Sequence, residues 1–313
     1  MHPPVIIVTN CTNRKRTNGS MVSLSEAQRQ GTLECVARRW VKAVKKAPRI
    51  DEAQNLYGGR SISEAKNAKK VVSGELYVVS AGLGLIHASE KIPAYNLTVS
   101  EGTGSLAPLL RNLGKRPSDW WSALINELSP PLSLRSLIEA NKKARVLLAL
   151  PSGYLELIAQ DLNDLTSAQT ERLRIITSRP GEAVLSQRLR RLVLPYDERL
   201  EGSTYAGTRT DFPQRALRHF VTELGGHNLD HVTAVSKVRD AMEAFQKPVR
   251  PARVRKSDDE ILALLQAKWD KHGGSSTRLL RYLRDDELVA CEQSRFRGLW
   301  LQMQKELSTR GEE

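Results

Sequence analysis

Runs of consecutive apolar residues, separated by polar turns, recur along most of the chain. They are short and continuous rather than alternating, which is the pattern of strands covered on both faces of a parallel sheet. Each run therefore predicts a buried strand. The predicted strands are residues 5–10 (VIIVTN), 75–81 (ELYVVSA), 144–150 (ARVLLAL), 173–178 (LRIITS) and 191–196 (RLVLPY).

Segments with helical spacing of apolar residues lie between these strands. The first covers 23–47, where a Ser-x-x-Glu capping box opens the helix and Pro48 ends it. Further helices are predicted over residues 61–72 and 154–165. Alternating strands and helices are typical of a doubly wound fold. The sequence therefore predicts an α/β domain over 1–245, with a mostly parallel sheet of about five strands.

The pattern changes after this domain. Residues 246–257 (QKPVRPARVRKS) contain five cations, two prolines and no acid, which predicts an extended basic linker. Residues 258–313 are predicted to form a helical module, with helices over 257–274, 275–284 and 286–307.

Three short helices after a basic segment favour a helix-turn-helix-like, DNA-binding module. Its last helix would lie in the major groove and present Gln293, Arg295 and Arg297 to DNA. A helical dimerisation module is the alternative that the pattern leaves open.

Charge strengthens the expectation of a nucleic-acid partner. The chain has 48 Lys and Arg against 35 Asp and Glu, a formal net charge of +13, which is typical of proteins that bind nucleic acid. A soluble basic protein without this function is the alternative, but the cations are clustered. Those predicted to contact DNA phosphates are Arg14, Lys15, Arg16, Arg38, Lys42, Arg253 and Arg255.

The cysteines and the N-terminal segment bear on location. Cys11, Cys35 and Cys291 are far apart and form no CxxC pair, which favours a reducing compartment and argues against a zinc site. The chain enters its first predicted strand without a signal peptide, and no apolar run reaches the ~20 residues that span a bilayer. We therefore expect a cytoplasmic protein with no membrane, metal or organic cofactor requirement; the oligomeric state is left open.

Polar residues and glycines follow four of the predicted strands. In open α/β sheets, ligands bind beyond the carboxyl ends of the strands. A binding pocket is therefore predicted at this edge of the sheet. The four strand endings are residues 9–16 (TNCTNRKR), 80–84 (SAGLG), 151–154 (PSGY) and 196–199 (YDER).

The second ending admits two interpretations. Small residues from Ser80 through Gly82 to Gly84 would let a flat ring or a sugar approach the backbone. Tyr95 would then supply a stacking face, and Asn96 a hydrogen-bonding edge. Alternatively, the glycines form a tight turn and Tyr95 fills the core. The segment alone does not decide between them.

Familiar catalytic motifs are missing. Gly82-Leu83-Gly84 lacks the third glycine of a dinucleotide fingerprint, and the sequence contains no GxxxxGK[ST] loop and no GxSxG elbow. His227 and His231 have metal-ligand spacing but no third ligand in the sequence.

Four short motifs together resemble a bacterial and phage domain family related to the uracil-DNA-glycosylase-like fold. The family includes phage-defence DNA glycosylases that remove glucosylated hydroxymethylcytosine from phage DNA. The motifs are CTNRK at 11–15, LYGG at 56–59, LYVVSAGLGLI at 76–86 and IPAYNLT at 92–98. Thr12, Ala94 and Asn96 stand where the family usually has Gly, Pro and Asp.

The resemblance implies roles for individual residues. Asn10 is the leading candidate to position the attacking water. Tyr57 and Tyr95 would stack on the base or wall the pocket, and Asp197 is a reserve carboxylate. The other residues expected at the base, the phosphate or the water are Asn13, Ser80, Gly82, Asn96, Ser152 and Tyr154.

The expected function is therefore hydrolysis of the N-glycosidic bond of a modified cytosine, leaving abasic sites in double-stranded phage DNA. Such a reaction needs a base flipped into a pocket and a polar group to place water at C1′. A non-catalytic DNA-binding regulator and a base-exchanging transglycosylase acting on RNA are the alternatives. Which base is excised, and whether the strand is also nicked, is left open by the residues.

Overall fold

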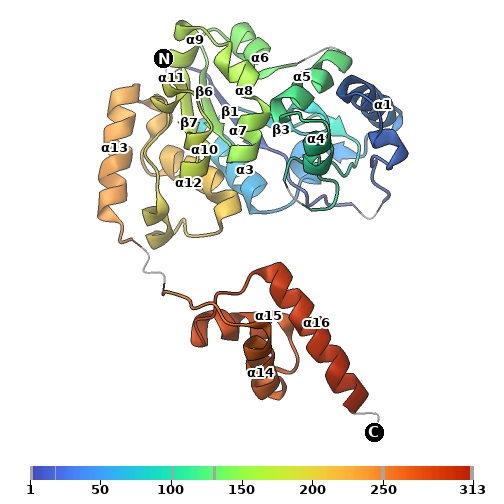
Figure 1. Ribbon diagram of the computed structural model, residues 1–313. Coiled ribbons are helices and arrows are strands. Elements are labelled where there is room, and N and C mark those ends of the chain that lie inside the picture. Colours follow the sequence, from blue (N-terminus) through green and yellow to red (C-terminus); the bar gives the residue numbers. More distant parts are fainter. Residues whose placement is uncertain (1–2, 18, 101, 130–131, 248–250, 311–313) are drawn as a thin grey trace. The chain divides into compact units, whose positions relative to one another are not determined.

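The computed structural model describes residues 3–17, 19–100, 102–129, 132–247 and 251–310, with the backbone alone for 308–310. The chain divides into two compact units, Met1–Pro248 and Val249–Glu313. Figure 1 shows both units. The predicted basic linker spans this division. Its residues 248–250, and residues 311–313 of the predicted helical module, lie outside the described part of the chain.

The first unit is built around a five-stranded sheet with the strand order β4-β3-β1-β6-β7. β1, β3, β6 and β7 run parallel, and β4 is antiparallel to β3. The predicted α/β class with a mostly parallel sheet is therefore confirmed. The strands are β1 (Val5–Asn10), β3 (Glu75–Ser80), β4 (Gly84–His87), β6 (Arg145–Ala149) and β7 (Leu173–Ile176). A small separate sheet pairs β2 (Asp51–Glu52) with β5 (Lys91–Ile92).

Helices cover both faces of the sheet, which explains why the strands are continuously apolar (Figure 1). The first connection holds α1 (Leu33–Lys46), α2 (Ala53–Leu56) and α3 (Arg60–Val72). Next come α4 (Ala107–Asn112), α5 (Pro117–Glu127), α6 (Leu134–Ala140), α7 (Ser152–Leu157), α8 (Ala159–Asn163) and α9 (Ser167–Glu171). The last are α10 (Arg179–Ala183), α11 (Gln187–Arg190), α12 (Phe212–Thr222) and α13 (His231–Ala244).

The two faces of the sheet have separate cores. Trp40 of α1 and the two tryptophans of α5 pack with Val8 and Leu148 on one face. Ala65 of α3 and Phe220 of α12 pack with Ile7 on the other. Side chains of adjacent strand residues point to opposite faces, and each of the four parallel strands contributes to both cores.

The prediction of a strand over 191–196 is wrong. The segment pairs with β7 at one point only, where Ile175 donates to the carbonyl of Leu192 and accepts from the N–H of Leu194. The ladder stops there because the next N–H that would face β7, that of Tyr196, donates instead to the carbonyl of Leu194 at 2.8 Å. The fifth strand is instead β4, which returns antiparallel to β3 through the turn that the sequence presented as an open strand end.

The first helix begins later than predicted. Residues 27–29 form only a 3₁₀ turn, and Gly31 adopts φ +92°. α1 then starts at Leu33, where the Thr32 side chain accepts a hydrogen bond from the Cys35 N–H. A left-handed glycine interrupts a helix, so the capping box at Ser23 does not begin α1.

The second unit contains α14 (Asp258–Lys268), α15 (Ser276–Arg281) with a π turn over Tyr282–Asp286, and α16 (Gln293–Arg310). α16 begins later than the predicted start at 286, because Leu288 takes φ +51° and Val289 pairs with Val254. Phe296 and Leu299 of α16 are buried, and the Trp300 ring stacks on Trp269. No helix among the described residues is long and apolar enough to cross a membrane.

Candidate functional site

Two side-chain amides meet at the carboxyl ends of β1 and β6. Asn10 ends β1 and is 6% exposed, whereas Gln214 lies in the first turn of α12 and is fully buried. Gln214 Nε2 donates to Asn10 Oδ1 at 2.8 Å. It also lies 3.1 Å from Thr9 Oγ1 and 2.9 Å from the carbonyl oxygen of Ala149. Asn10 Nδ2 donates to the carbonyl of Cys11 at 2.8 Å, so its amide is held from both sides.

Asn10 and Gln214, called the amide pair below, lie where ligands bind in this class of fold. The chain visits β3 on one side of β1 and later β6 on the other, so the β1–β6 boundary is the switch point of the parallel strands. Gln214 Oε1 is buried and has no hydrogen-bond partner among the described residues. Leaving such an acceptor unpaired costs about 1–3 kcal/mol, so a water or a ligand group is expected to complete it.

Sequence reasoning missed Gln214. It is 204 residues from Asn10 along the chain, and no motif surrounds it. The available signal is its place on the apolar side of α12, three residues before Leu217 and seven before Val221. A polar residue at a core position of an amphipathic helix requires a buried partner.

Tyr154 links α7 to the same strand end. Its side chain is 3% exposed, and its hydroxyl donates to the carbonyl of Cys11 at 3.0 Å. The Tyr154 hydroxyl oxygen also lies 3.0 Å from the Sγ of Cys11. Burial raises the pKa of Tyr154 well above its ordinary value, so the phenol stays neutral. Tyr154 therefore holds the β1 loop against α7. Ser152, two residues earlier, is partly exposed at the start of α7.

Tyr57, Tyr95 and Ser80 form a buried chain of hydroxyl groups. Both rings are fully buried. The Tyr57 and Tyr95 hydroxyl oxygens are 2.6 Å apart, and Tyr95 Oη is 2.6 Å from Ser80 Oγ. Burial raises the pKa of both tyrosines well above 10, the ordinary value. Because neither ring presents a face to solvent, the predicted stacking role is not open to them in this structure.

The glycines of the β3–β4 turn make room for the protein's own rings. A Cβ on Gly82 would lie 2.9 Å from atoms of both Trp40 and Tyr95, and the Trp40 Nε1 donates to the Gly82 carbonyl at 2.6 Å. Gly84 adopts φ +74°, which starts the return strand. The predicted approach of a ligand to this turn is therefore replaced by close internal packing.

Lys15 lies beside the tyrosines. Its Nζ is 4.4 Å from the centroid of the Tyr95 ring and 5.4 Å from that of Tyr57, and it donates to the carbonyl of Thr12 at 2.6 Å. No carboxylate among the described residues is within ion-pair distance of this amine. Burial lowers the pKa of Lys15, because it removes water from the ammonium. Lys15 thus holds its own loop through the hydrogen bond to Thr12 and is less exposed than Arg14 and Arg16.

Lys15→Met is expected to change how stability depends on pH. The folded-state pKa of Lys15 is below the ~10.4 of an unfolded lysine, so the unfolded chain binds more protons in the window between the two values. The buried ammonium therefore destabilises the wild type at neutral pH, and this penalty fades as pH rises towards the unfolded pKa. Urea unfolding between about pH 7 and pH 10 should show the wild type gaining stability relative to Lys15→Met. A constant difference would contradict a burial-lowered pKa.

Asp197 and Asn96 contact groups other than the amide pair. Both oxygens of Asp197 accept hydrogen bonds from Arg199, at 2.8–3.0 Å. Burial opposes ionisation of Asp197, but the Arg199 hydrogen bonds outweigh it and the pKa of the carboxyl is lowered. Asn96 Oδ1 packs against Gly104, where a Cβ would overlap it. Among the described residues, no hydrogen bond joins either side chain to Asn10.

The predicted DNA contacts of the first unit are mostly exposed. Asn13, Arg14 and Arg16 lie exposed on the loop after β1, and Lys42 is exposed on α1. Arg38, also on α1, pairs with Glu127 at 3.2 Å. Arg14 and Arg16 are thus exposed cations on the loop that follows the strand end with the amide pair.

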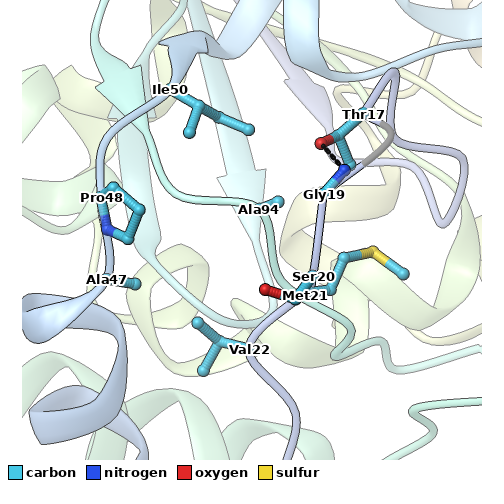
Figure 2. Close-up of a pocket in the computed structure, with 9 residues that line it drawn as sticks. All are labelled: Thr17, Gly19, Ser20, Met21, Val22, Ala47, Pro48, Ile50 and Ala94. Atoms are coloured by element: carbon cyan, nitrogen blue, oxygen red, sulfur yellow. Dashed lines mark hydrogen bonds between the residues drawn. The ribbon is translucent and has the colours of Figure 1, made fainter.

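A separate pocket of about 310 Å³ lies beside the Tyr95 segment. Figure 2 shows Thr17 and residues 19–22 on one wall, Ala47, Pro48 and Ile50 on the other, and Ala94 between them. Thr17 Oγ1, one of its few polar side-chain atoms, accepts a hydrogen bond from the Gly19 N–H. The lining has no ionisable side chain, so the pocket supplies apolar walls and backbone groups but no acid or base.

The chain matches no protein-family model, no curated protein and no solved structure in comparisons with known proteins. Among the described residues, no three His, Cys, Asp or Glu side chains gather closely enough to hold a metal ion.

Proposed function

We propose that the chain is a DNA glycosylase and that its amide pair holds the attacking water. The observation that supports this most strongly is the buried acceptor of Gln214, which has no partner among the described residues, beside Asn10 at the switch point. Arg14 and Arg16 are exposed on the loop that follows the same strand end, and their charge suits the phosphates that flank a flipped nucleotide.

Neutral amides suit this reaction. As the bond from C1′ to the base nitrogen breaks, its electron pair leaves with the base and the sugar becomes oxocarbenium-like. Water then needs orientation rather than deprotonation in advance, and it loses its proton to solvent after bonding to C1′. Asn10 and Gln214 can accept hydrogen bonds from this water, and Gln214 keeps the Asn10 amide from rotating.

The finer parts of the proposal rest on the sequence resemblance. It supports a uracil-DNA-glycosylase-like fold for the first unit and glucosylated hydroxymethylcytosine in phage DNA as the substrate. We also propose that the second unit, as a helix-turn-helix-like module, keeps the enzyme on the duplex. Gln293 and Arg297 are exposed near the start of α16, which supports contact with DNA.

An abasic-site assay tests the enzyme proposal. Duplexes containing glucosylated hydroxymethylcytosine, hydroxymethylcytosine or cytosine would be incubated with the full chain and probed with an aldehyde-reactive reagent. We expect aldehydes in the glucosylated duplex alone. Aldehydes in another modified duplex would support the glycosylase reaction with a different substrate. The absence of aldehydes from every duplex would refute the enzyme proposal.

Replacing Arg14 and Arg16 together by alanine should weaken substrate binding more than chemistry. Because both side chains are exposed, the fold should be unaffected. For each arginine that binds a phosphate, the substitution is expected to lower the slope of log affinity against log salt by ~0.9. Single-turnover rates at saturating DNA should stay near wild type. A large fall in the saturated rate with unchanged affinity would instead place one of these arginines at the reacting sugar.

A non-catalytic DNA-binding regulator is the second candidate. It is favoured by the complete burial of the Tyr57 and Tyr95 rings, which removes the stacking face predicted for a flipped base. A regulator would bind modified duplex without producing aldehydes, so the same assay combined with a binding measurement separates the two functions.

A further inference from the structure

The second unit contains a pocket of about 570 Å³ whose lining is dominated by arginine. Four of its seven lining residues are arginines, and they come from three separate segments of this unit. The lining residues are Arg253, Arg255, Arg284, Ala290, Cys291, Glu292 and Arg295. In the lining of this arginine pocket, four arginines stand against one carboxylate, Glu292.

Backbone pairing brings two of the arginines to the pocket. The Val254 N–H donates to the carbonyl of Leu288, and the Ala290 N–H donates back to Val254, each at 2.8 Å. In an extended segment, residues two apart point to the same side. Arg253 and Arg255 therefore face the pocket together, and Val254 is left 65% exposed.

Hydrogen bonds to the protein fix the direction of the other guanidinium groups. Arg284 donates through Nε and Nη2 to the carbonyl of Cys291, at 3.1 and 2.8 Å. Arg295 donates to the carbonyl of Lys256 and to Asp258. Each guanidinium has five N–H groups, so both keep donors in reserve. Fixed guanidinium planes lose little entropy when they bind a further acceptor.

Arg253 and Arg255 differ in what holds them. Arg253 donates to the carbonyl of Arg284 at 2.8 Å and to Asp285 at 3.0 Å. Arg255 is exposed and forms no hydrogen bond or ion pair with any residue that the structure describes. It is therefore the member of the pocket whose charge remains available to a ligand.

These features select the chemistry of the ligand. A cluster of guanidinium groups favours an anion, and phosphate matches the fork geometry of arginine. The lining includes no aromatic side chain on which a base could stack. The pocket therefore suits the phosphates of a nucleic-acid backbone better than a free nucleotide.

We propose that the arginine pocket binds backbone phosphates of duplex DNA without recognising the base sequence. This role differs from base recognition by the last helix, because Arg295 is turned to Asp258 and the pocket rather than held out for a base edge. Phosphate binding by this pocket is also independent of base release in the first unit, since a non-catalytic regulator would need the same contact with DNA.

The test uses the full chain and two duplexes of unrelated, unmodified sequence. Arg255→Ala removes a pocket charge while leaving the hydrogen bonds of the other pocket arginines in place, and Arg255→Glu reverses it. Arg278→Ala is the matched control, because Arg278 is exposed on α15 and does not line the pocket. We expect Arg255→Ala to weaken binding to both duplexes equally and to lower the slope of log affinity against log salt by about 0.9. Arg255→Glu should weaken binding to both duplexes further. Arg278→Ala should keep the wild-type slope.

Three outcomes would overturn the proposal. An unchanged slope in both Arg255 variants would show that the pocket does not meet phosphates. A loss confined to one duplex would show sequence reading instead. Tight binding of a nucleoside triphosphate that Arg255→Ala abolishes, with duplex affinity unchanged, would assign the pocket to a free phosphorylated ligand.

Discussion

Replacing Asn10 by alanine is expected to slow base release from glucosylated hydroxymethylcytosine DNA by ~10²–10³-fold, the usual effect of losing one well-placed polar group. The substitution removes the amide that Gln214 holds and so leaves the water without an oriented acceptor. It also removes two buried hydrogen bonds, at about 0.5–1.5 kcal/mol each, which is small beside a typical folding stability. Single-turnover base release, DNA affinity and thermal unfolding would be measured together.

Two further variants sharpen this prediction. Asn163→Ala makes the same chemical change at an exposed position on α8 and should release base at the wild-type rate. Gln214→Leu should lower the rate by a similar factor to Asn10→Ala. The double variant should be little worse than either single one, because both amides orient the same water. Normal turnover by Asn10→Ala would place the water elsewhere, and an unfolded variant would show that Asn10 is a structural residue.

The sheet could be predicted because burial on both faces imposes a simple pattern. Residues 5–10, 75–80, 145–149 and 173–176 are mostly apolar, and all four form parallel strands. The same pattern failed over 191–196. Apolar content there reflects contact with the core, but pairing with β7 stops at one bridge, because the Tyr196 N–H donates to the carbonyl of Leu194 instead. Apolar runs report burial, and backbone donors decide whether a buried run becomes a strand.

Only one residue of the amide pair, Asn10, could be predicted from the sequence. Asn10 can be singled out because it ends the first strand, where ligands bind in such sheets. Its partner Gln214 could not be found, since the contact crosses most of the first unit and depends on how α12 packs. The tyrosines show the opposite limit. Tyr57 and Tyr95 do lie near the strand end. The sequence does not reveal that their hydroxyl groups hydrogen-bond to each other and that both rings are buried in the core.

Arg215 ties the start of α12 to the loop before it. Its side chain is fully buried and donates to Asp211 at 2.6 Å and to Glu201 at 2.7 Å. It also donates to the carbonyls of Tyr205 and Thr208. Because Gln214 is the preceding residue, this network fixes the helical turn that presents the amide pair. Arg215 is therefore a positioning residue as well as a structural one.

Arg215→Met is expected to lower the free energy of unfolding by ~3–5 kcal/mol, because it leaves Asp211 buried without its cation. At roughly 2–4 °C per kcal/mol for a unit of this size, the melting temperature should fall by roughly 6–20 °C. Arg218→Met is the matched control on the same helix. Its side chain is 39% exposed, and its partner Glu64 keeps a second hydrogen bond, from Arg60, so we expect a loss below about 1 kcal/mol.

Arg215→Lys separates positioning from stability. It keeps a charge for Asp211 but lacks the planar fork that reaches Glu201 and the two carbonyls together. We expect part of the lost stability to return while base release, measured well below the melting temperature, remains slow with unchanged DNA affinity. If Arg215→Lys restored the rate and the stability in step, the arginine would serve the fold alone. If Arg215→Met melted like the wild type, the buried ion pair would not hold α12 in place, and the orientation of Gln214 would need another cause.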